Sequence, residues 1–259
     1  MIPHVLLSND DGVFAPGLRA LADAFLADGW RVSVCAPESE RSAASHSITI
    51  RHPIVAAARA WEGVVEGAPL AVWACSGTPA DCVKVAILKL CNARPDLVVS
   101  GVNNGWNLGT DVHYSGTVGA AMEGAFEGVP GMAVSAPARV DASRSVFAAA
   151  CAVRLARRML ARPIPPRTVL SLNVPDRDGR DVLGLVEAPM TPIRYTDDYD
   201  EMTHSRSRSA YWLKGEIIEE GRLPGGDLDR LLAGYATVTL LGWDLTLPGG
   251  CKEILQDMI

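Results

Sequence analysis

Two adjacent carboxylates, Asp10 and Asp11, directly follow the first apolar run of the chain, in the segment Ser-Asn-Asp-Asp-Gly at 8–12. The apolar run at residues 4–8 is typical of a short β-strand, and ligands of open α/β sheets bind at the carboxyl ends of the strands. Two carboxylates in a confined place repel each other, and a hard divalent cation such as Mg²⁺ or Mn²⁺ relieves that repulsion while accepting oxygen ligands. We therefore hypothesise a metal site; a solvated Asp-Asp-Gly turn is the alternative.

A second oxygen-rich segment, Ser-Gly-Val-Asn-Asn-Gly at 100–105, follows another expected strand at 96–100. If both strands belong to one parallel sheet, Asn103 faces the same crevice as Asp10 and Asp11. Its amide oxygen suits the same cation. The alternative is an Asn-Gly-rich turn that binds no ligand.

A third segment, Tyr-Ser-Gly-Thr at 114–117, directly precedes a helical pattern that begins near Val118. Ser115 and Thr117 bring two hydroxyls to a helix N-terminus, whose free backbone amides attract anions. The simpler alternative is that Ser115 or Thr117 only caps the helix. Together, the three segments describe a metal beside a phosphate.

Composition and missing motifs narrow the function further. The chain has 24 Lys and Arg against 30 Asp and Glu, a formal charge of −6, which argues against a stable nucleic-acid complex. It contains no phosphate-binding P-loop, no G-x-S-x-G nucleophile elbow, no G-x-G-x-x-G fingerprint and no H-E-x-x-H motif. Gly12 stands where an aspartyl-phosphate enzyme needs its second Asp, which disfavours a covalent phospho-aspartate mechanism.

Strand-like and helix-like patterns alternate along the first two thirds of the chain, which indicates a doubly wound, mostly parallel α/β sheet. Thr78 and Pro79 resemble the start of a helix, as an N-cap followed by proline at the first helical position. The stretches 48–57 and 63–75 are expected to form a hairpin-like excursion, and 101–114 a Gly/Asn-rich loop. The remaining elements are expected as strands at 4–8, 30–36, 96–100, 132–134 and 169–173 and as helices at 17–27, 79–91, 118–126 and 148–160.

The character of the sequence changes near residue 176. Residues 190–230 are rich in charge, Pro and Gly, and 235–241 alternates like a strand. We therefore divide the chain into a catalytic α/β core at 1–175 and a β-rich extension at 176–259 that packs back on the core. The six cysteines form no C-x-x-C pair and are interpreted as reduced core residues. No signal-peptide core or membrane-spanning run is present, so a cytoplasmic location is expected.

At this point the sequence closely resembles the SurE family, the stationary-phase survival proteins with 5′/3′-nucleotidase activity. The resemblance is long, ordered and specific. It runs through VLLSNDDGVFAPG at 5–17, APESERSAASHSIT at 36–49, SGTPADCV at 76–83, PDLVVSGVNNGWNLGTDVHYSGTVGAAMEG at 95–124 and LSLNVP at 170–175.

The resemblance implies site residues one by one. A metal would be held by the two aspartates of S-N-D-D-G, the serine of R-S-x-x-S and the asparagine of S-G-x-N, here Asp10, Asp11, Ser42 and Asn103. The phosphate would lie near the Y-S-G-T segment, which maps onto Ser115, Gly116 and Thr117, with Asn107 of N-L-G close by. Ser42 and Asn107 come from the resemblance and were not suggested by the residue patterns themselves.

The resemblance also implies an assembly. Members of the family share an α/β core with a C-terminal extension exchanged between subunits, and they form dimers or tetramers. Two departures put substrate preference and the shape of the C-terminal hairpin in doubt. Trp106 replaces the proline usual in G-P-N-L-G, and His-Ser-Arg-Ser at 204–207 stands where a D-P-R-G-like turn is common.

We therefore predict a metal-dependent 5′/3′-nucleotidase that hydrolyses nucleoside monophosphates to nucleoside and phosphate, with one Mg²⁺ or Mn²⁺ per subunit. Asp10 and Asp11 hold the metal and one of them takes the proton of the attacking water, while Ser115, Gly116 and Thr117 hold the phosphoryl oxygens. The alternatives are a phosphatase acting on polyphosphate or another small phosphomonoester, and a nucleotide-binding stress protein without turnover.

Two further expectations concern aromatic residues. The segment 190–230 is expected to cross to a neighbouring subunit, because Tyr195, Tyr199, Tyr211 and Trp212 would otherwise form an unusual exposed patch. A local hairpin is the alternative. Trp106 is expected to line the mouth of the site and stack on a base or ribose, and a buried packing role is the alternative.

Overall fold

The computed structural model describes residues 2–63, 67–138, 142–196, 198–205, 208–218 and 223–246. The strands are β1 (His4–Ser8), β2 (Arg31–Pro37), β3 (Ala56–Ala58), β4 (Leu70–Cys75), β5 (Leu97–Asn104), β6 (Gly131–Ala136), β7 (Thr168–Asn173), β8 (Leu185–Glu187), β9 (Asp198–Ser205), β10 (Arg208–Lys214) and β11 (Ala236–Gly242). The helices are α1 (Pro16–Ala27), α2 (Pro79–Val85), α3 (Gly116–Phe126), α4 (Ala142–Ala161) and α5 (Asp227–Ala233), with short helical turns η1 (Ala86–Leu90), η2 (Gly109–His113) and η3 (Gly179–Asp181).

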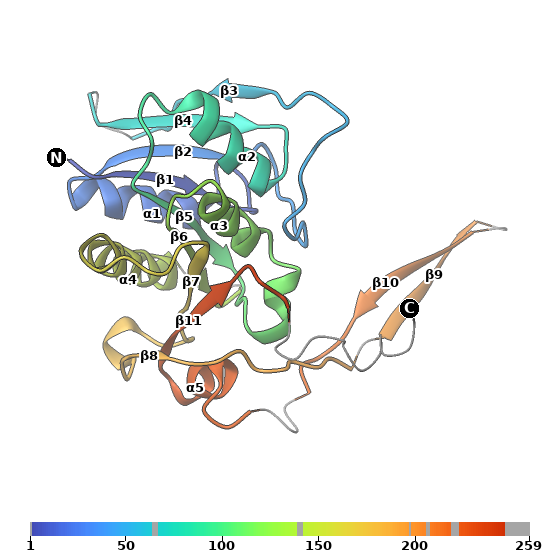
Figure 1. Cartoon of the computed structure of the whole chain (residues 1–259). Coiled ribbons are helices and arrows are strands. Elements are labelled where there is room, and N and C mark those ends of the chain that lie inside the picture. The colour runs from blue at the N-terminus through green and yellow to red at the C-terminus, as the bar shows by residue number, and fades with distance from the viewer. Residues whose placement is uncertain are drawn as a thin grey trace, which may run out of the picture.

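A nine-stranded sheet in the order β3-β4-β2-β1-β5-β6-β7-β11-β8 forms the centre of the molecule (Figure 1). Strands β4, β2, β1, β5, β6 and β7 run parallel to one another, whereas β3 and β11 run antiparallel to their partners β4 and β7. The prediction of a doubly wound, mostly parallel α/β fold is confirmed.

Alternate residues of the central strands build two separate apolar layers. In β1, Val5 and Leu7 join a core cluster with residues of α1 and α4, and Leu6 joins a second cluster with residues of α2 and α3. Because successive side chains of a strand point to opposite faces, one pair of helices covers each face of the sheet. The carboxyl ends of β1 and β5 therefore open between these layers, where the predicted site residues lie.

Two of the predicted boundaries were wrong. The expected hairpin over 48–75 exists as β3–β4, but β3 has only three residues and β4 lies inside the central sheet beside β2. Both faces of β4 are apolar, with Val72 and Ala74 in one cluster and Cys75 in the other, and such a strand is stable only when covered on both sides. The strand at 96–100 also continues to Asn104, where the sequence favoured a loop from residue 101.

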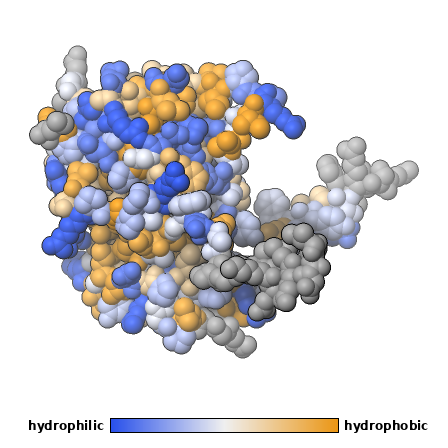
Figure 2. Space-filling view, in the orientation of Figure 1, coloured by the Kyte–Doolittle hydropathy of each residue, from blue (hydrophilic) through white to orange (hydrophobic). Residues whose placement is uncertain are grey.

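The C-terminal third divides between the sheet and a projecting hairpin. Strands β8 and β11 pair with the central sheet, and α5, which the sequence did not predict, packs beside β11. Strands β9 and β10 form a separate antiparallel pair that extends away from the body of the molecule (Figures 1 and 2). Within the described ranges, no helix has both the length and the hydropathy to cross a membrane. The division at residue 175 and the exchange between subunits stay predictions.

Candidate metal and phosphate site

The turn after β1 fixes the two carboxylates. Asn9 is fully buried, and its side chain closes the turn: Nδ2 donates to the Gly12 carbonyl oxygen at 3.0 Å and Oδ1 accepts from the Gly12 N–H at 3.2 Å. Gly12 has φ +105°, a conformation that favours glycine. The backbone of Asp10 and Asp11 is thus held at the carboxyl end of β1 before any ligand binds.

Asp10 lies against the N-terminus of α3. The Thr117 hydroxyl and the backbone N–H groups of Gly116 and Thr117 donate to its carboxylate. A Cβ on Gly116 would lie 2.9 Å from Asp10 Oδ2, so only glycine permits this approach. Burial raises the pKa of Asp10, and these hydrogen bonds oppose the rise. Asp10 is therefore a buried, ordered carboxylate, which excludes the solvated-turn alternative for it.

Asn103 and Asn104, at the end of β5, connect to the same carboxylates. Asn103 Nδ2 donates to the Gly105 carbonyl oxygen at 2.8 Å, and its Oδ1 lies 3.3 Å from the Thr117 hydroxyl that also contacts Asp10. The Asn104 N–H donates to the Asp11 carboxylate. The structure thus brings together the first two segments singled out in the sequence.

These groups line a polar cleft of about 290 Å³. Burial, and after it the negative charges of Asp10 and Glu40, raise the pKa of Asp11 to about 6. The raised pKa means that a second negative charge is unfavourable in this cleft unless a cation balances it. The carboxylate, amide and hydroxyl oxygens that line the cleft are the donors that a hard divalent cation prefers. The lining residues are Asp10, Asp11, Glu40, Ser42, Ala43, Asn103, Asn104, Asn107, Asp111, Tyr114 and Ser115.

Ser42 enters this cleft from the loop that follows β2. Its hydroxyl donates to Glu40 at 2.5 Å, and Glu40 is a lining carboxylate that the sequence reasoning missed. Ala43 and Ser45 have φ +55° and +53°, a left-handed conformation that costs non-glycine residues energy and recurs at functional sites. The Arg41 N–H donates to the Asp10 carbonyl oxygen at 2.7 Å, which ties the loop to the carboxylate turn.

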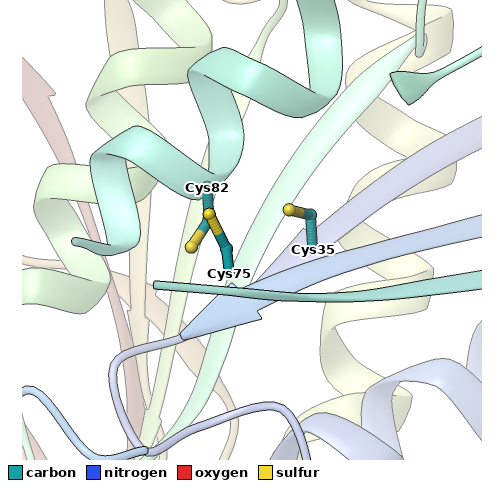
Figure 3. A group of neighbouring side chains, drawn as sticks. All are labelled: Cys35, Cys75 and Cys82. Carbon is teal, nitrogen blue, oxygen red and sulfur yellow. The ribbon is translucent and has the colours of Figure 1, made fainter. Parts of the chain in front are cut away.

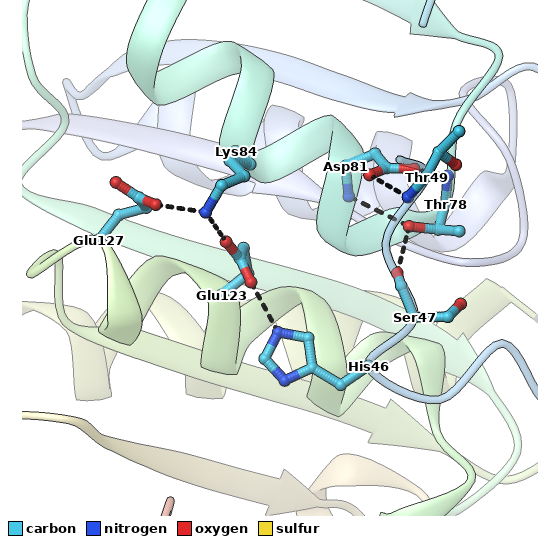
Figure 4. A network of polar contacts seen from close by, with 8 residues as sticks. All are labelled: His46, Ser47, Thr49, Thr78, Asp81, Lys84, Glu123 and Glu127. Carbon is cyan, nitrogen blue, oxygen red and sulfur yellow. Dashed lines mark hydrogen bonds and ion pairs between the residues drawn. The ribbon is translucent and has the colours of Figure 1, made fainter. Parts of the chain in front are cut away.

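A polar network holds the far end of this loop (Figure 4). The ring of His46 is 2.7 Å from the buried carboxylate of Glu123 in α3, and Lys84 of α2 lies 2.6 Å from both Glu123 and Glu127. The N-terminus of α2 also holds this loop. The Thr78 hydroxyl caps α2 and donates to the Ser47 carbonyl oxygen at 2.6 Å, which confirms Thr78 as the predicted N-cap.

The four residues assigned to phosphate fall into two pairs. Asn107 and Ser115 line the cleft, and Ser115 also caps α3 by accepting from the Val118 N–H at 3.1 Å. Gly116 and Thr117 are buried behind them, where they contact Asp10. The helix N-terminus predicted for an anion is therefore engaged by a carboxylate of the chain itself, and its direct contact with phosphate stays a prediction.

Trp106 does not lie where the sequence placed it. Its indole N–H donates to the Val174 carbonyl oxygen at 2.8 Å, and its ring packs against the cluster of Leu108, Ile193, Leu228 and Leu231. It is not among the residues that line the cleft, so the packing alternative holds. The aromatic residue at the mouth is Tyr114, which is 67% exposed.

A larger cavity of about 1120 Å³ adjoins the polar cleft. Tyr114 and Asp111 line both, so the two spaces lie side by side at the end of η2. The Tyr195 hydroxyl donates to Asp111, which fixes one wall. The other walls come from residues before β9 and at the base of the hairpin, namely Ile193, Arg194, Tyr199, Leu213 and Lys214.

Comparisons with known proteins match this arrangement over nearly the whole chain. The family described as "Survival protein SurE" matches residues 5–197. The chain is 44% identical to a 5′-nucleotidase SurE of Synechococcus elongatus, covering 94% of this chain and 95% of the relative, and 46% identical to that of Parasynechococcus marenigrum, covering 98% and 96%. The crystal structure of the SurE protein from Aquifex aeolicus superposes with a TM-score of 0.81 at 34% identity, covering 98% of each chain.

Proposed function

The chain belongs to the SurE family, and on that premise we propose that it is a metal-dependent 5′-nucleotidase with its reaction centre in the cleft between β1 and β5. The name 5′-nucleotidase that its relatives carry makes the chain a nucleotidase, a hydrolase of phosphomonoesters. The observation that carries the position of the site is the pair Asp10 and Asp11, held at a strand end with raised pKa values.

Asp10, Asp11, Ser42 and Asn103 would hold one Mg²⁺ or Mn²⁺ per subunit. All four line the cleft and offer carboxylate, hydroxyl or amide oxygen, the donors that these cations prefer. A divalent cation bound there supplies neutralisation of phosphoryl charge and a lowered pKa for a water molecule. Glu40 supports the set by accepting from Ser42, which orients the Ser42 lone pairs.

Side chains of the protein would position the metal ligands, accept a proton and bind the phosphoryl group. Thr117 and the N-terminus of α3 keep Asp10 in place, so that it binds without rearrangement. Asp11, with a pKa of about 6, is suited to accept a proton from the attacking water near neutral pH. Asn107 is held by Asn173 and Ser135, and with Ser115 it would bind the phosphoryl oxygens.

The larger cavity beside the cleft would take the nucleoside. A nucleotide phosphate in the polar cleft has its sugar and base directed along η2, past the exposed ring of Tyr114. Tyrosine rings stack on bases without strong sequence preference, so Tyr114 and Tyr199 are candidates for this contact. Such a site accepts several nucleoside monophosphates rather than one.

The hairpin β9–β10 would complete the site of a second subunit in a homodimer or homotetramer. Tyr199, Met202, Tyr211, Trp212 and Leu213 are all between 49% and 68% exposed. The strand pairing places Tyr199, Tyr211 and Leu213 on one face and Met202 and Trp212 on the other. A projecting hairpin with apolar side chains on both faces is stable when a partner covers it. The substitution at 204–207 lies partly outside the described residues, so its effect on this hairpin stays open to experiment.

A phosphate-release screen tests the proposal. The purified chain is assayed with a panel of nucleoside 5′- and 3′-monophosphates, a sugar phosphate and polyphosphate, each with Mg²⁺, Mn²⁺ or chelator. We expect phosphate release from the nucleoside monophosphates that is lost in chelator and restored by metal. Turnover that persists undiminished in chelator, or that favours polyphosphate over every nucleotide, would contradict the proposal.

A further inference from the structure

Three cysteine side chains, from two neighbouring strands and a helix, lie close together in the interior (Figure 3). Cys35 belongs to β2 and Cys75 to the neighbouring β4, where they point to the same face because Cys35 pairs with Trp73, two residues before Cys75. Cys82 approaches from the first turns of α2. Their three Sγ atoms all lie within 4.8 Å of one another, the one such group of His, Cys, Asp and Glu side chains in the described residues.

The cluster is buried and its surroundings are apolar. Cys35, Cys75 and Cys82 have 0% exposure and lie in the same core cluster as Leu6, Val83, Ala86, Ile87 and Val98. Asp81 is the charged group that influences Cys75, and its charge is negative. An anionic complex in this place would be both desolvated and repelled, which disfavours it strongly.

We propose that Cys35, Cys75 and Cys82 form a binding site for a trivalent thiophilic ion, of the class represented by arsenite. Three thiolates neutralise a trivalent centre completely, so the complex carries no charge into the apolar core. The reaction is As(OH)₃ + 3 RSH → As(SR)₃ + 3 H₂O: three As–O bonds are exchanged for three As–S bonds, each thiol proton leaves in a water molecule, and no oxidation state changes. A divalent ion with three thiolates would keep one negative charge, and Cu⁺ would keep two.

The thiols are also poised for this exchange. The Cys35 and Cys82 thiols both donate hydrogen bonds to the Cys75 sulfur, so the three sulfurs already contact one another before an ion binds. Burial raises the pKa of Cys82, which keeps its proton until a ligand displaces it. The sulfurs belong to two adjacent strands and a helix that pack together, so small side-chain rotations are enough to bring them onto one ion.

Access is from the carboxyl end of β4. Cys75 is followed by the turn to Thr78, and Cys82 lies just inside the first turn of α2, a short helix of seven residues. Local opening of such an end occurs at much lower free energy than global unfolding. An ion bound to the three sulfurs would shift the turn that contains Thr78. Thr78 donates to the Ser47 carbonyl oxygen, so this shift would also reach the loop that carries Ser42.

Arsenite binding to the whole chain tests this inference independently of nucleotidase activity. Native mass spectrometry should find one arsenic per chain, and X-ray absorption at the arsenic edge should find three sulfur neighbours. All samples carry Cys251→Ser, because Cys251 lies outside the described residues. Cys82→Ser or Cys35→Ser should weaken binding by about 10²-fold or more, since the third thiol acts at the high effective concentration of a chelate.

Two matched variants serve as controls. Cys91→Ser removes a half-buried thiol that packs against the same cluster, and Cys151→Ser removes a buried thiol elsewhere; both should bind arsenite like the parent. Circular dichroism checks that each variant is folded, and the sulfur count on the parent chain needs no variant. Two sulfur neighbours, undiminished binding by Cys82→Ser, or tighter binding of Zn²⁺ than of arsenite would overturn the proposal.

Discussion

The carboxyl edge of the sheet and the β9–β10 hairpin use their side chains in opposite ways. At the edge, Asn9, Asp10 and Thr117 are buried and hydrogen-bonded to one another's segments, so the chain itself fixes their positions. On the hairpin, Tyr211 and Trp212 are 62% and 68% exposed, and the ring of Tyr211 contacts that of Tyr199 edge-on. The first region concentrates negative charge whose repulsion a cation would relieve, and the second exposes apolar surface that a partner subunit would cover.

This difference between the two regions predicts which properties a metal ion and a second subunit would each change. A metal ion binding at the edge changes charge and pKa but needs little movement, because α3 and the turn after β1 are already in place. A second subunit on the hairpin would bury apolar surface and change little charge, since Lys214 already has Asp198 and Asp200 beside it. Substitutions in the two regions should therefore separate activity from assembly.

The largest effect is expected from Asp11→Asn. The change removes one negative charge from the metal cleft at nearly constant volume, and a metal ion contributes several kcal/mol to transition-state stabilisation, so kcat should fall by about 10³-fold or more. Steady-state phosphate release measures it. Asp23→Asn, an exposed carboxylate paired with Arg19 on α1, is the control and should keep full activity.

Substitutions on the hairpin should alter assembly first. Trp212→Ser should raise the dissociation constant of the oligomer by about 30-fold, as expected for loss of a large aromatic contact worth about 2 kcal/mol. Light scattering over a dilution series measures the change. Phe14→Ser removes an aromatic of similar exposure, 65%, from the body and should leave assembly unchanged. A parent chain that stays monomeric at every concentration, with full activity, would contradict the exchange.

The edge should also impose a pH dependence on the metal-free protein. Because the pKa of Asp11 is raised from 3.8 to about 6, the folded state holds its proton where the unfolded state has lost it. The unfolding free energy should therefore fall as pH rises from about 4 to about 6. Denaturant titrations in chelator measure it, and Asp11→Asn should show a shallower slope. Equal slopes in the two proteins would mean that Asp11 is not perturbed.

The affinity for the metal should change over the same pH range, but it should rise with pH where the unfolding free energy falls. Protonation of Asp11 competes with the cation, so affinity should rise with pH up to about 6 and then level off. Titration of Mn²⁺ at several pH values measures it.

The smallest effect is expected in the Ser42 loop. Ala43→Gly should relieve a left-handed conformation that costs about 1–2 kcal/mol and lose about 0.4–1 kcal/mol through the freer unfolded chain, for a net gain of at most about 1.6 kcal/mol. Thermal melts of the chelated protein measure it. Ala44→Gly is the control, since Ala44 has no positive φ and its loss should only destabilise.

Local patterns predicted most of the core. Val5, Leu7 and the 17–27 repeat identified β1 and α1, because apolar periodicity is written in consecutive residues. The place of β4 was missed, since pairing with β2 depends on residues almost forty positions earlier in the chain. The continuation of β5 to Asn104 was missed for the same reason: its Gly and Asn residues favour a loop locally, but β6 supplies the pairing.

The candidate site was likewise predictable where residue type and strand ends identify it, and not where it depends on contacts between distant segments. Asp10, Asp11 and Asn103 could be identified from residue type and strand ends alone, and Ser42 only from the family resemblance. Glu40 carried no signal, because a glutamate in a polar loop is usually solvated. Trp106 was assigned to the cleft because it follows Asn103 closely in the sequence, but its ring packs against Leu108 and Leu228. The aromatic residue that lines the cleft is Tyr114.

The most direct test of the metal-site assignment is calorimetric titration of Mn²⁺ into the protein and its Asp11→Asn variant, both stripped of metal with a chelator that is then removed. The parent should bind one Mn²⁺ per chain, with a rise in melting temperature that follows mass action, and the variant should bind far more weakly while keeping its fold and assembly. Undiminished Mn²⁺ binding by Asp11→Asn, with an unchanged shift in melting temperature, would contradict the account and move the metal away from the carboxyl edge of β1.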